Sequence, residues 1–321
     1  MAEVKRLTWI DCLRALAIFG VVYGHCSQDN HFFFLFTSPV KMPLFFAITG
    51  FLLKDDIGVS SFFKGILQKL IIPWFFLGLF PIIFQVPTRG FAFFLSYFVK
   101  MIEGEVIWFM PCFIYGQIIH FLIRKYLNKT SYIVAVTMLC VLVGFFWTHR
   151  ETEIFTTLNR AMIVQAFFFI GFIFKRYSHI FFNLKKVYFG VGVMLYFLLG
   201  VLSERFFPGE SIDVHLNHYC CIPFSFLFIF LGVFLLFYIA PKINFHFDWI
   251  KKIGQNTLVI YIWHGYAVAL FAKLLTLFNV DYCNIYGIAM LKTIFACATC
   301  CLLSILLNRL CPYLIGKRPR E

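Results

Sequence analysis

Charged residues are scarce in this sequence, and acidic residues are the scarcest. Only 13% of its 321 residues are Asp, Glu, Lys or Arg, and 15 acidic residues stand against 28 basic ones. No soluble domain needs as much apolar surface as the rest of the chain supplies. The sequence also lacks internal repeats, Gly/Ser-rich linkers and polar segments long enough to fold alone. We therefore expect one domain over residues 1–321, with a short basic tail from about residue 309.

Apolar residues fill the chain instead. They make up 61% of it, and 46 residues are phenylalanine. Apolar runs of roughly 20 residues recur, and this length matches the ~30 Å hydrocarbon core of a bilayer. We predict an all-α fold, a polytopic membrane helix bundle with about ten transmembrane helices. The predicted spans are residues 9–27, 40–53 (extending back into 32–36), 66–84, 105–123, 132–148, 161–174, 187–203, 220–239, 256–278 and 286–308.

The first apolar run is interpreted as a retained span. Lys5 and Arg6 precede it, as basic residues do in a secretory signal peptide. However, Asp11 and Arg14 interrupt the apolar region, and no small-x-small cleavage site follows it. We therefore expect this segment to stay in the membrane.

The formal net charge of +13 has a topological explanation. With the N-terminus inside, we assign 19 Lys and Arg residues to cytoplasmic segments and 6 to the other side: Lys41, Arg89, Lys100, Arg150, Arg160 and Arg205. Membrane proteins collect basic residues in their cytoplasmic loops. We expect a multi-pass protein of the cell inner (plasma) membrane with both termini cytoplasmic. The lipid bilayer is then a partner, and nucleic acid is not.

Metal ligands are not expected. The 11 cysteines lie mostly inside apolar spans, where free Cys packs as a small hydrophobe, and the Cys297–Cys300 pair lacks a polar second shell and a second ligand pair. His215 and His218 share an outer loop with Asp213, but the three do not form a full ligand set. The sequence therefore predicts no metal site.

Three ionisable residues share one face of the first span. Arg14 and His25 are eleven residues apart, so they lie within about 20° of one helix face and about 16 Å apart along the axis. Asp11 precedes Arg14 by three residues and can pair with it. Ionisable groups in membranes are costly and usually face a cavity or the bundle interior. An interfacial Asp11–Arg14 pair with a packing histidine is the ordinary alternative.

The two ends of this stripe suit different chemistry. Histidine can take a proton from a hydroxyl at physiological pH. The cationic fork of arginine suits phosphates. With Arg14 toward the cytoplasm and His25 toward the far side, the stripe predicts a phosphate-bearing donor entering from inside and an acceptor near the opposite face.

Five motifs, in this order along the chain, resemble those of one family. Arg14 and His25 within IDCLRALAIFGVVYGH match an Arg-x10-His signature. The others are MPLFFAITGF (residues 42–51), FFKGILQKLIIPW (62–74), Trp108-Phe109 and IGQNTLVIYIWHGY (253–266). Together they resemble the acyltransferase-3 family of integral-membrane O-acyltransferases, which includes enzymes that acetylate bacterial surface sugars. The basic segment departs from the family, because Lys64 and Lys69 stand where arginines are usual.

The resemblance implies a membrane O-acyltransferase, most often an acetyl-CoA-dependent O-acetyltransferase. Such an enzyme moves an acyl group from cytoplasmic acyl-CoA to a hydroxyl of a sugar in a surface glycan or lipid-linked glycan intermediate, which is a polysaccharide modification. Acyl-CoA is then the donor substrate, and no permanently bound cofactor is expected.

The residue chemistry and the resemblance together suggest roles for individual residues. The predicted catalytic residues are His25, Arg14 and Asp11, with His25 as general base or transient acyl carrier. Arg14, Lys64 and Lys69 are predicted to hold the CoA phosphates, and Glu105 and Trp108 to contact the sugar. Each of the last four residues also has an ordinary explanation. Glu105 then lies in a solvated loop, Trp108 belongs to an interfacial aromatic belt, and the two lysines are ordinary cytoplasmic cations. For His264, in the ninth span, packing or a structural hydrogen bond is favoured over a catalytic role.

Two other classes of protein stay open. A transporter or flippase for a polar or lipid-linked substrate would use the intramembrane charges to bind its cargo or relay protons. It predicts paired inverted repeats, which the sequence does not clearly show. A sensor or membrane scaffold would need no reactive histidine.

Overall fold

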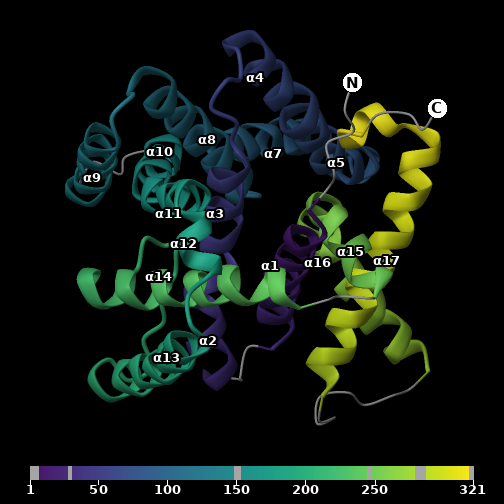
Figure 1. Ribbon diagram of the computed structural model, residues 1–321. Coiled ribbons are helices and arrows are strands. Elements are labelled where there is room, and N and C mark those ends of the chain that lie inside the picture. Colours follow the sequence, from purple (N-terminus) through teal and green to yellow (C-terminus); the bar gives the residue numbers. More distant parts are fainter. Residues whose placement is uncertain (1–6, 28–30, 148–152, 244–246, 279–286, 318–321) are drawn as a thin grey trace. The chain divides into compact units, whose positions relative to one another are not determined.

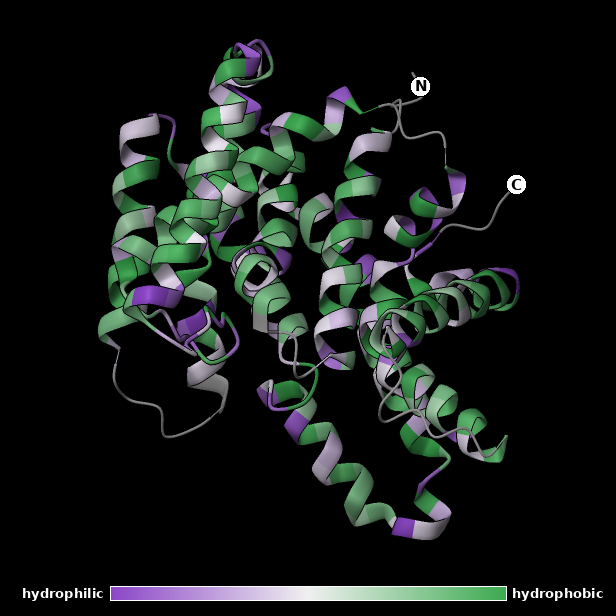
Figure 2. Ribbon diagram, turned by 90° about the horizontal axis from the view of Figure 1, so that it is seen from below, coloured by the Kyte–Doolittle hydropathy of each residue, from purple (hydrophilic) through white to green (hydrophobic). Residues whose placement is uncertain are grey.

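The computed structural model describes residues 7–27, 31–147, 153–243, 247–278 and 287–317. Within these ranges the regular structure is helical, and the only β pairing is an isolated antiparallel bridge between Asp213 and His218. Figure 2 shows helices that are mostly apolar, with polar residues gathered at their ends and in the loops. The expected all-α bundle is confirmed.

The chain divides into two compact units. Unit 1 comprises Met1–Phe45, Tyr177–Asp213 and His218–Ile305, and unit 2 comprises Phe46–Arg176, Val214–Asn217 and Leu306–Glu321. That one functional domain spans residues 1–321 stays a prediction.

Unit 1 contains the first helix and most of the C-terminal half of the chain (Figure 1). Its elements are α1 (Thr8–Cys26), α2 (His31–Lys41), α12 (Ser178–Phe182), α13 (Lys186–Phe206), α14 (Ile222–Ile239), the 3₁₀ turn η2 (Ala240–Lys242), α15 (Asp248–Gln255), α16 (Thr257–Leu277) and most of α17 (Ile288–Leu310). Helix α1 packs against α2, α15 and α16.

Unit 2 contains the helices between them in the sequence. Its elements are most of α3 (Pro43–Leu52), α4 (Val59–Ile66), the π-helical turn η1 (Leu67–Ile71), α5 (Ile72–Ile83), α6 (Val86–Arg89), α7 (Phe91–Glu103), α8 (Phe109–Tyr126), α9 (Thr130–Phe146), α10 (Glu153–Ile163), α11 (Gln165–Arg176) and the 3₁₀ turn η3 (Pro312–Ile315). Phe46 lies at the centre of its aromatic core, with the Phe109, Phe113, Phe167 and Phe168 ring centroids 5.3 to 6.3 Å away.

Eight segments of the described chain are long and apolar enough to cross a membrane. They are Thr8–Cys26, Phe32–Leu52, Val59–Ile83, Thr156–Arg176, Lys186–Phe206, Ile222–Lys242, Thr257–Leu277 and Ile288–Leu310. The other two predicted spans coincide with α8, which has 18 residues, and with α9, a shorter apolar helix of 17 residues. Each predicted span therefore has a helix, and the second does extend back into the Phe-rich segment.

Short helices such as α12 and α15 were not predicted, and two further differences concern the spans and a connection between them. Helix α7 occupies part of the connection between the third and fourth predicted spans, and at 13 residues it is too short to be recognised as a span. The second predicted span is divided into α2 and α3, because Pro43 has no N–H to continue the helix and disfavours helical geometry at Met42.

Candidate active site

The N-terminal end of the stripe on α1 is an ion pair supported from α15. Asp11 Oδ1 lies 3.6 Å from Arg14 Nη1, and Gln255 Nε2 donates a hydrogen bond of 3.2 Å to Asp11 Oδ2. The Asp11 side chain is 2% exposed, whereas that of Arg14 is 30% exposed. A buried carboxylate needs partners of this kind. The ion pair therefore orients the guanidinium, and part of the Arg14 side chain reaches solvent.

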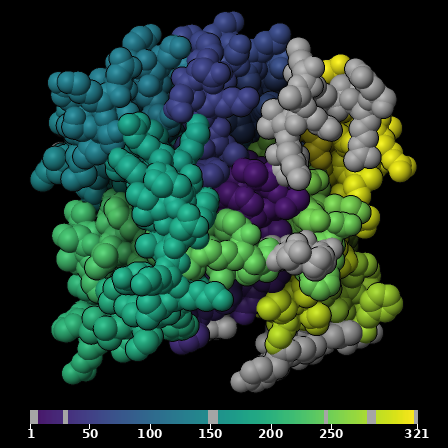
Figure 3. Space-filling model, in the orientation of Figure 1, coloured from purple at the N-terminus to yellow at the C-terminus, as the bar shows by residue number. Residues whose placement is uncertain are grey.

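A glycine allows α15 to come this close to α1. A Cβ on Gly254 would collide with the backbone carbonyl of Asp11. Without one, the two backbones are in contact, and the next residue, Gln255, reaches the Asp11 carboxylate. Part of α1 is also visible at the surface on the face shown in Figure 3.

The C-terminal end of the stripe is a pair of histidines. His25 lies in the last turn of α1 and is exposed. Its ring centroid is 5.0 Å from that of His264 on α16, and the two ring planes are 35° apart. At this separation the imidazoles are in contact. Two titratable rings from different predicted spans therefore meet at one end of the stripe.

The hydrogen bonds of His264 determine which of its nitrogens carries the proton. His264 Nδ1 lies 2.8 Å from the carbonyl oxygen of Tyr261 and 3.1 Å from that of Ile260. Carbonyl oxygens only accept hydrogen bonds, so Nδ1 carries a hydrogen. In the neutral ring Nε2 then has the free lone pair and is an acceptor.

Sequence reasoning did not group Gln255 with Asp11 or His264 with His25. It expected His264 to pack or to hydrogen-bond structurally, and its Nδ1 does bond to its own helix. What the sequence could not show is that its ring touches His25. Both residues lie in the family-like motif at residues 253–266, and that motif was the only indication in the sequence that they belong to the site.

The two predicted CoA-binding lysines lie in unit 2. Lys64 is in the last turn of α4 and Lys69 is in the π-helical turn, and both are exposed. Pro73, in the first turn of α5, has no N–H to donate to the Lys69 carbonyl, which is one reason for the widened turn. π-Helical turns occur frequently at functional sites.

Glu105 and Trp108 also lie in unit 2 but have different surroundings. Glu105 is exposed and pairs with Lys100 at 2.6 Å, so its carboxylate is already engaged. Trp108 stacks on His215, with centroids 4.7 Å apart and planes at 26°. The guanidinium of the buried Arg160 lies over the same indole, 5.8 Å from its centroid. The structure therefore surrounds Trp108 with a histidine and an arginine that sequence reasoning had not grouped with it.

The turn before Trp108 contains an unusual backbone geometry. Ile107 has φ of 57°, and Gly104 three residues earlier has φ of 89°. Positive φ is ordinary for glycine but is an outlier for a β-branched residue. Such strain persists where surrounding structure imposes it, and it is concentrated at functional sites. This geometry fits a functional position for Trp108.

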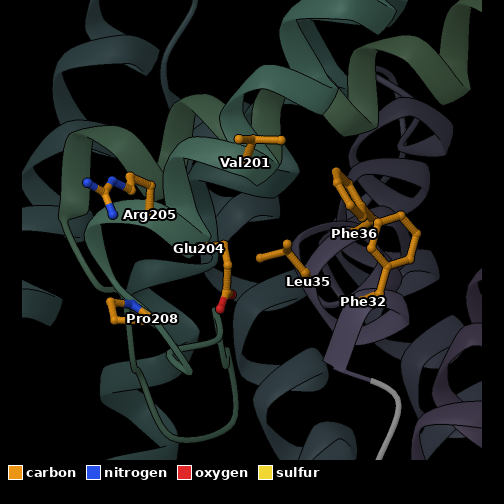
Figure 4. Close-up of a pocket in the computed structure, with 7 residues that line it drawn as sticks. All are labelled: Phe32, Leu35, Phe36, Val201, Glu204, Arg205 and Pro208. Atoms are coloured by element: carbon orange, nitrogen blue, oxygen red, sulfur yellow. The ribbon is translucent and has the colours of Figure 1, made fainter.

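Unit 1 also has apolar cavities, one smaller and two larger. One of the larger two, of about 470 Å³, is lined mainly by apolar side chains of α1, α2, α13 and α14. The other, of about 550 Å³, is lined by Phe32, Leu35, Phe36, Val201, Glu204, Arg205 and Pro208. Figure 4 shows Leu35 and Glu204 between the two phenylalanines and Pro208, with Arg205 pointing away from the phenyl rings. None of the predicted site residues lines either cavity.

A comparison with protein families gives one match. The model of an acyltransferase domain matches residues 7–309. This range includes the residues at both ends of the stripe on α1 and those around Trp108. Comparisons with curated proteins and with solved structures give no match.

Proposed function

The chain belongs to this acyltransferase family, and from that premise we propose that it moves an acyl group from acyl-CoA, with acetyl-CoA as the first choice of donor, to a hydroxyl of a sugar. That the protein is a multi-pass membrane acyltransferase follows from the family and the apolar helices. The donor, the acceptor and the roles of individual residues are the proposal. The observation that carries it is the contact between His25 and His264, because it gives an acyltransferase an exposed base with a second ring behind it.

In this mechanism Arg14 binds the donor. Its guanidinium is held by Asp11, and Asp11 is held by Gln255, so little side-chain freedom is lost when a phosphate is bound. Asp11 is then a positioning residue, since its buried carboxylate touches Arg14 and not the substrate. The exposed Lys64 and Lys69 supply further positive charge for CoA phosphates, as point charges without a bidentate fork.

His25 activates the acceptor. Its ring takes the proton from the sugar hydroxyl while the hydroxyl oxygen bonds to the acyl carbonyl carbon. The carbon–sulfur bond of the thioester then breaks, and the departing CoA thiolate takes the proton from His25. The His264 ring contacts that of His25, and its Nδ1 is bonded to the helix backbone. Its Nε2 lone pair is therefore proposed to accept a hydrogen bond from protonated His25 and to stabilise the imidazolium formed between these two proton transfers.

The sugar is proposed to bind at Trp108. The indole offers an apolar face, and His215 and Arg160 beside it offer hydrogen-bond donors. A few polar groups around an aromatic surface are typical of small-molecule sites. The pairing of Glu105 with Lys100 makes Glu105 the weaker of the two predicted sugar contacts.

The acceptor is a surface glycan or a lipid-linked glycan intermediate, and the protein is placed in the inner membrane with both termini cytoplasmic. The distribution of Lys and Arg in the sequence supports this orientation. In this orientation His25 lies at the end of α1 that is farther from the cytoplasm, about 16 Å from Arg14 along the helix axis.

Mass spectrometry of surface glycans tests the proposal. Cells that carry the gene should yield glycan fragments with an acyl mass increment, and cells without it or with His25→Ala should not. Purified membranes supplied with radiolabelled acetyl-CoA should transfer label to the same glycan. If glycans of the two cell lines have identical masses and no label is transferred, acetylation of a surface sugar is wrong. A transporter or flippase predicts that outcome.

A further inference from the structure

The loop between α13 and α14 has a defined backbone geometry. The Asp213 N–H donates to the His218 carbonyl over 3.0 Å, and the His218 N–H donates to the Asp213 carbonyl over 2.8 Å. This reciprocal pair fixes His218 opposite Asp213. It also brings together residues from the two sides of the loop, Glu210 before the bridge and Cys220 after it.

Three potential metal ligands meet there. One carboxylate oxygen of Glu210, one ring nitrogen of His218 and the sulfur of Cys220 all lie within 4.8 Å of one another. His218 Nε2 is 3.0 Å from Glu210 Oε2. The set differs from the one considered in the sequence, where His218 was grouped with His215. In the structure His215 stacks on Trp108 instead.

The other nitrogen of His218 is already engaged. His218 Nδ1 lies 2.9 Å from the carbonyl oxygen of Ser211. Because that oxygen can only accept, Nδ1 carries a hydrogen, and the lone pair of the neutral ring is on Nε2, which faces Glu210. Metal-binding histidines almost always donate their second ring N–H to a carbonyl or carboxylate in this way.

An ion pair between protonated His218 and Glu210 is the simpler explanation of their contact, but it leaves the nearby thiol unexplained. Mixed nitrogen, oxygen and sulfur donors suit zinc, whereas calcium and magnesium prefer oxygen ligands alone. The His218 and Glu210 side chains are 44% and 51% exposed, so an ion can reach them from solvent.

We propose that Glu210, His218 and Cys220 form a zinc site that ties the two sides of this loop together. The three side chains leave the fourth tetrahedral position of Zn²⁺ to water or to a ligand. Zn–ligand distances of roughly 2.0 to 2.3 Å require only small movements of side chains that are already this close. The site is independent of acyl transfer and does not rest on the proposed function.

Metal binding by the purified full-length protein tests the site. The protein carries a histidine-free affinity tag, is stripped with a chelator in detergent and is titrated with Zn²⁺ against a chromophoric competitor. We expect about one tightly bound zinc per chain, and at least about tenfold weaker binding in Glu210→Gln, His218→Ala and Cys220→Ser. Cys221→Ser is the matched control, because Cys221 is exposed, adjacent in sequence and outside the cluster. It should bind zinc as the wild type does.

A spectroscopic readout comes second, and its first outcome, in the wild type, does not depend on how any variant folds. Co²⁺ bound in place of Zn²⁺ should show a thiolate-to-cobalt charge-transfer band in the near ultraviolet and tetrahedral visible bands. Absence of that band in the wild type, or its loss in Cys221→Ser with retention in Cys220→Ser, overturns the site. The site is also overturned if the three ligand variants bind zinc as tightly as the wild type does.

Discussion

The ring of His25 at the end of α1 lies against the ring of His264 on α16, with centroids 5.0 Å apart. The two residues are far apart in the sequence and lie in different predicted spans. His264 Nδ1 bonds to the backbone of its own helix, and this leaves Nε2 as an acceptor for a neighbouring donor. The relationship resembles a catalytic base with an orienting group behind it, here with imidazole in the place of a carboxylate.

Replacing His25 should abolish the chemistry and spare the fold. His25 is exposed, so His25→Ala leaves no internal cavity. Loss of a general base typically costs ~10²–10⁴-fold in rate, so acetyl transfer to glycan should fall by about that factor. Transfer of radiolabel in membranes, normalised to the amount of inserted protein, measures the effect.

A second exposed histidine provides the control for His25. His179 on α12 lies outside the stripe, and His179→Ala should retain wild-type activity. Wild-type turnover by His25→Ala would refute the mechanism even though the family membership remains. A covalent acyl–His25 adduct, trapped in the wild type by rapid acid quench, would replace the general-base role with that of an acyl carrier.

Two replacements of His264 should show whether it positions His25 or only fills space. His264→Leu removes the acceptor, and kcat should fall by about 10²–10⁴-fold, as happens when the group that orients a catalytic histidine is lost. His264→Gln keeps an acceptor oxygen on the side chain and should recover part of that loss. The His25→Ala/His264→Leu double variant should be no worse than His25→Ala alone. Equal activity of the Leu and Gln variants, or additive losses, would assign His264 to packing.

Replacing Arg14 should affect the donor more than the acceptor. Hydrogen bonds to charged groups contribute roughly 1.5–3 kcal/mol, so Arg14→Ala should raise KM for acetyl-CoA by about 10–100-fold. Arg14→Lys should recover only part of this affinity, because lysine lacks the fork. Initial rates over a range of acetyl-CoA concentrations, at saturating glycan, measure the change. Lys273→Ala serves as the control, and an unchanged KM in Arg14→Ala would remove Arg14 from the donor site.

Adding one methyl group at Gly254 should destabilise the protein. The new Cβ would collide with the Asp11 carbonyl and force α15 away from α1, at a cost of about 1–3 kcal/mol. Gly190→Ala on α13 is the matched control, because its Cβ would meet nothing within 4 Å. Alanine is the better helix former, so the control should be neutral or slightly stabilising. Thermal unfolding in detergent compares the two variants, and equal melting temperatures would contradict the close contact of the two helices.

The orientation of the chain can be tested at α12. Reporter fusions at residue 180 should give a cytoplasmic signal, because the segment between Lys175 and Lys186 is rich in basic residues. Fusions at the N-terminus and after residue 317 should agree. An extracytoplasmic signal at residue 180 together with a cytoplasmic N-terminus would exclude an arrangement of ten spans with both ends inside.

Much of the fold could be predicted from the sequence alone, because a bilayer imposes a simple rule. Backbone groups in hydrocarbon must be satisfied within their own segment, so apolar runs of about 20 residues become helices. This is why the predicted spans correspond to helices, and why the register of Asp11, Arg14 and His25 on α1 was predictable from helical geometry. Helix α7 and the break at Pro43 were missed because they depend on shorter segments.

The neighbours of each side chain were decided by tertiary packing. The sequence shows that Gly254 has no side chain, but not that the missing Cβ leaves room for the Asp11 carbonyl, and with it the bond from Gln255. It shows two histidines in two spans, but not that their rings touch. Local sequence determines which segments are helical and which residues share a helix face. Which faces meet depends on how side chains from distant segments fit together, and that was known only once the helices were packed.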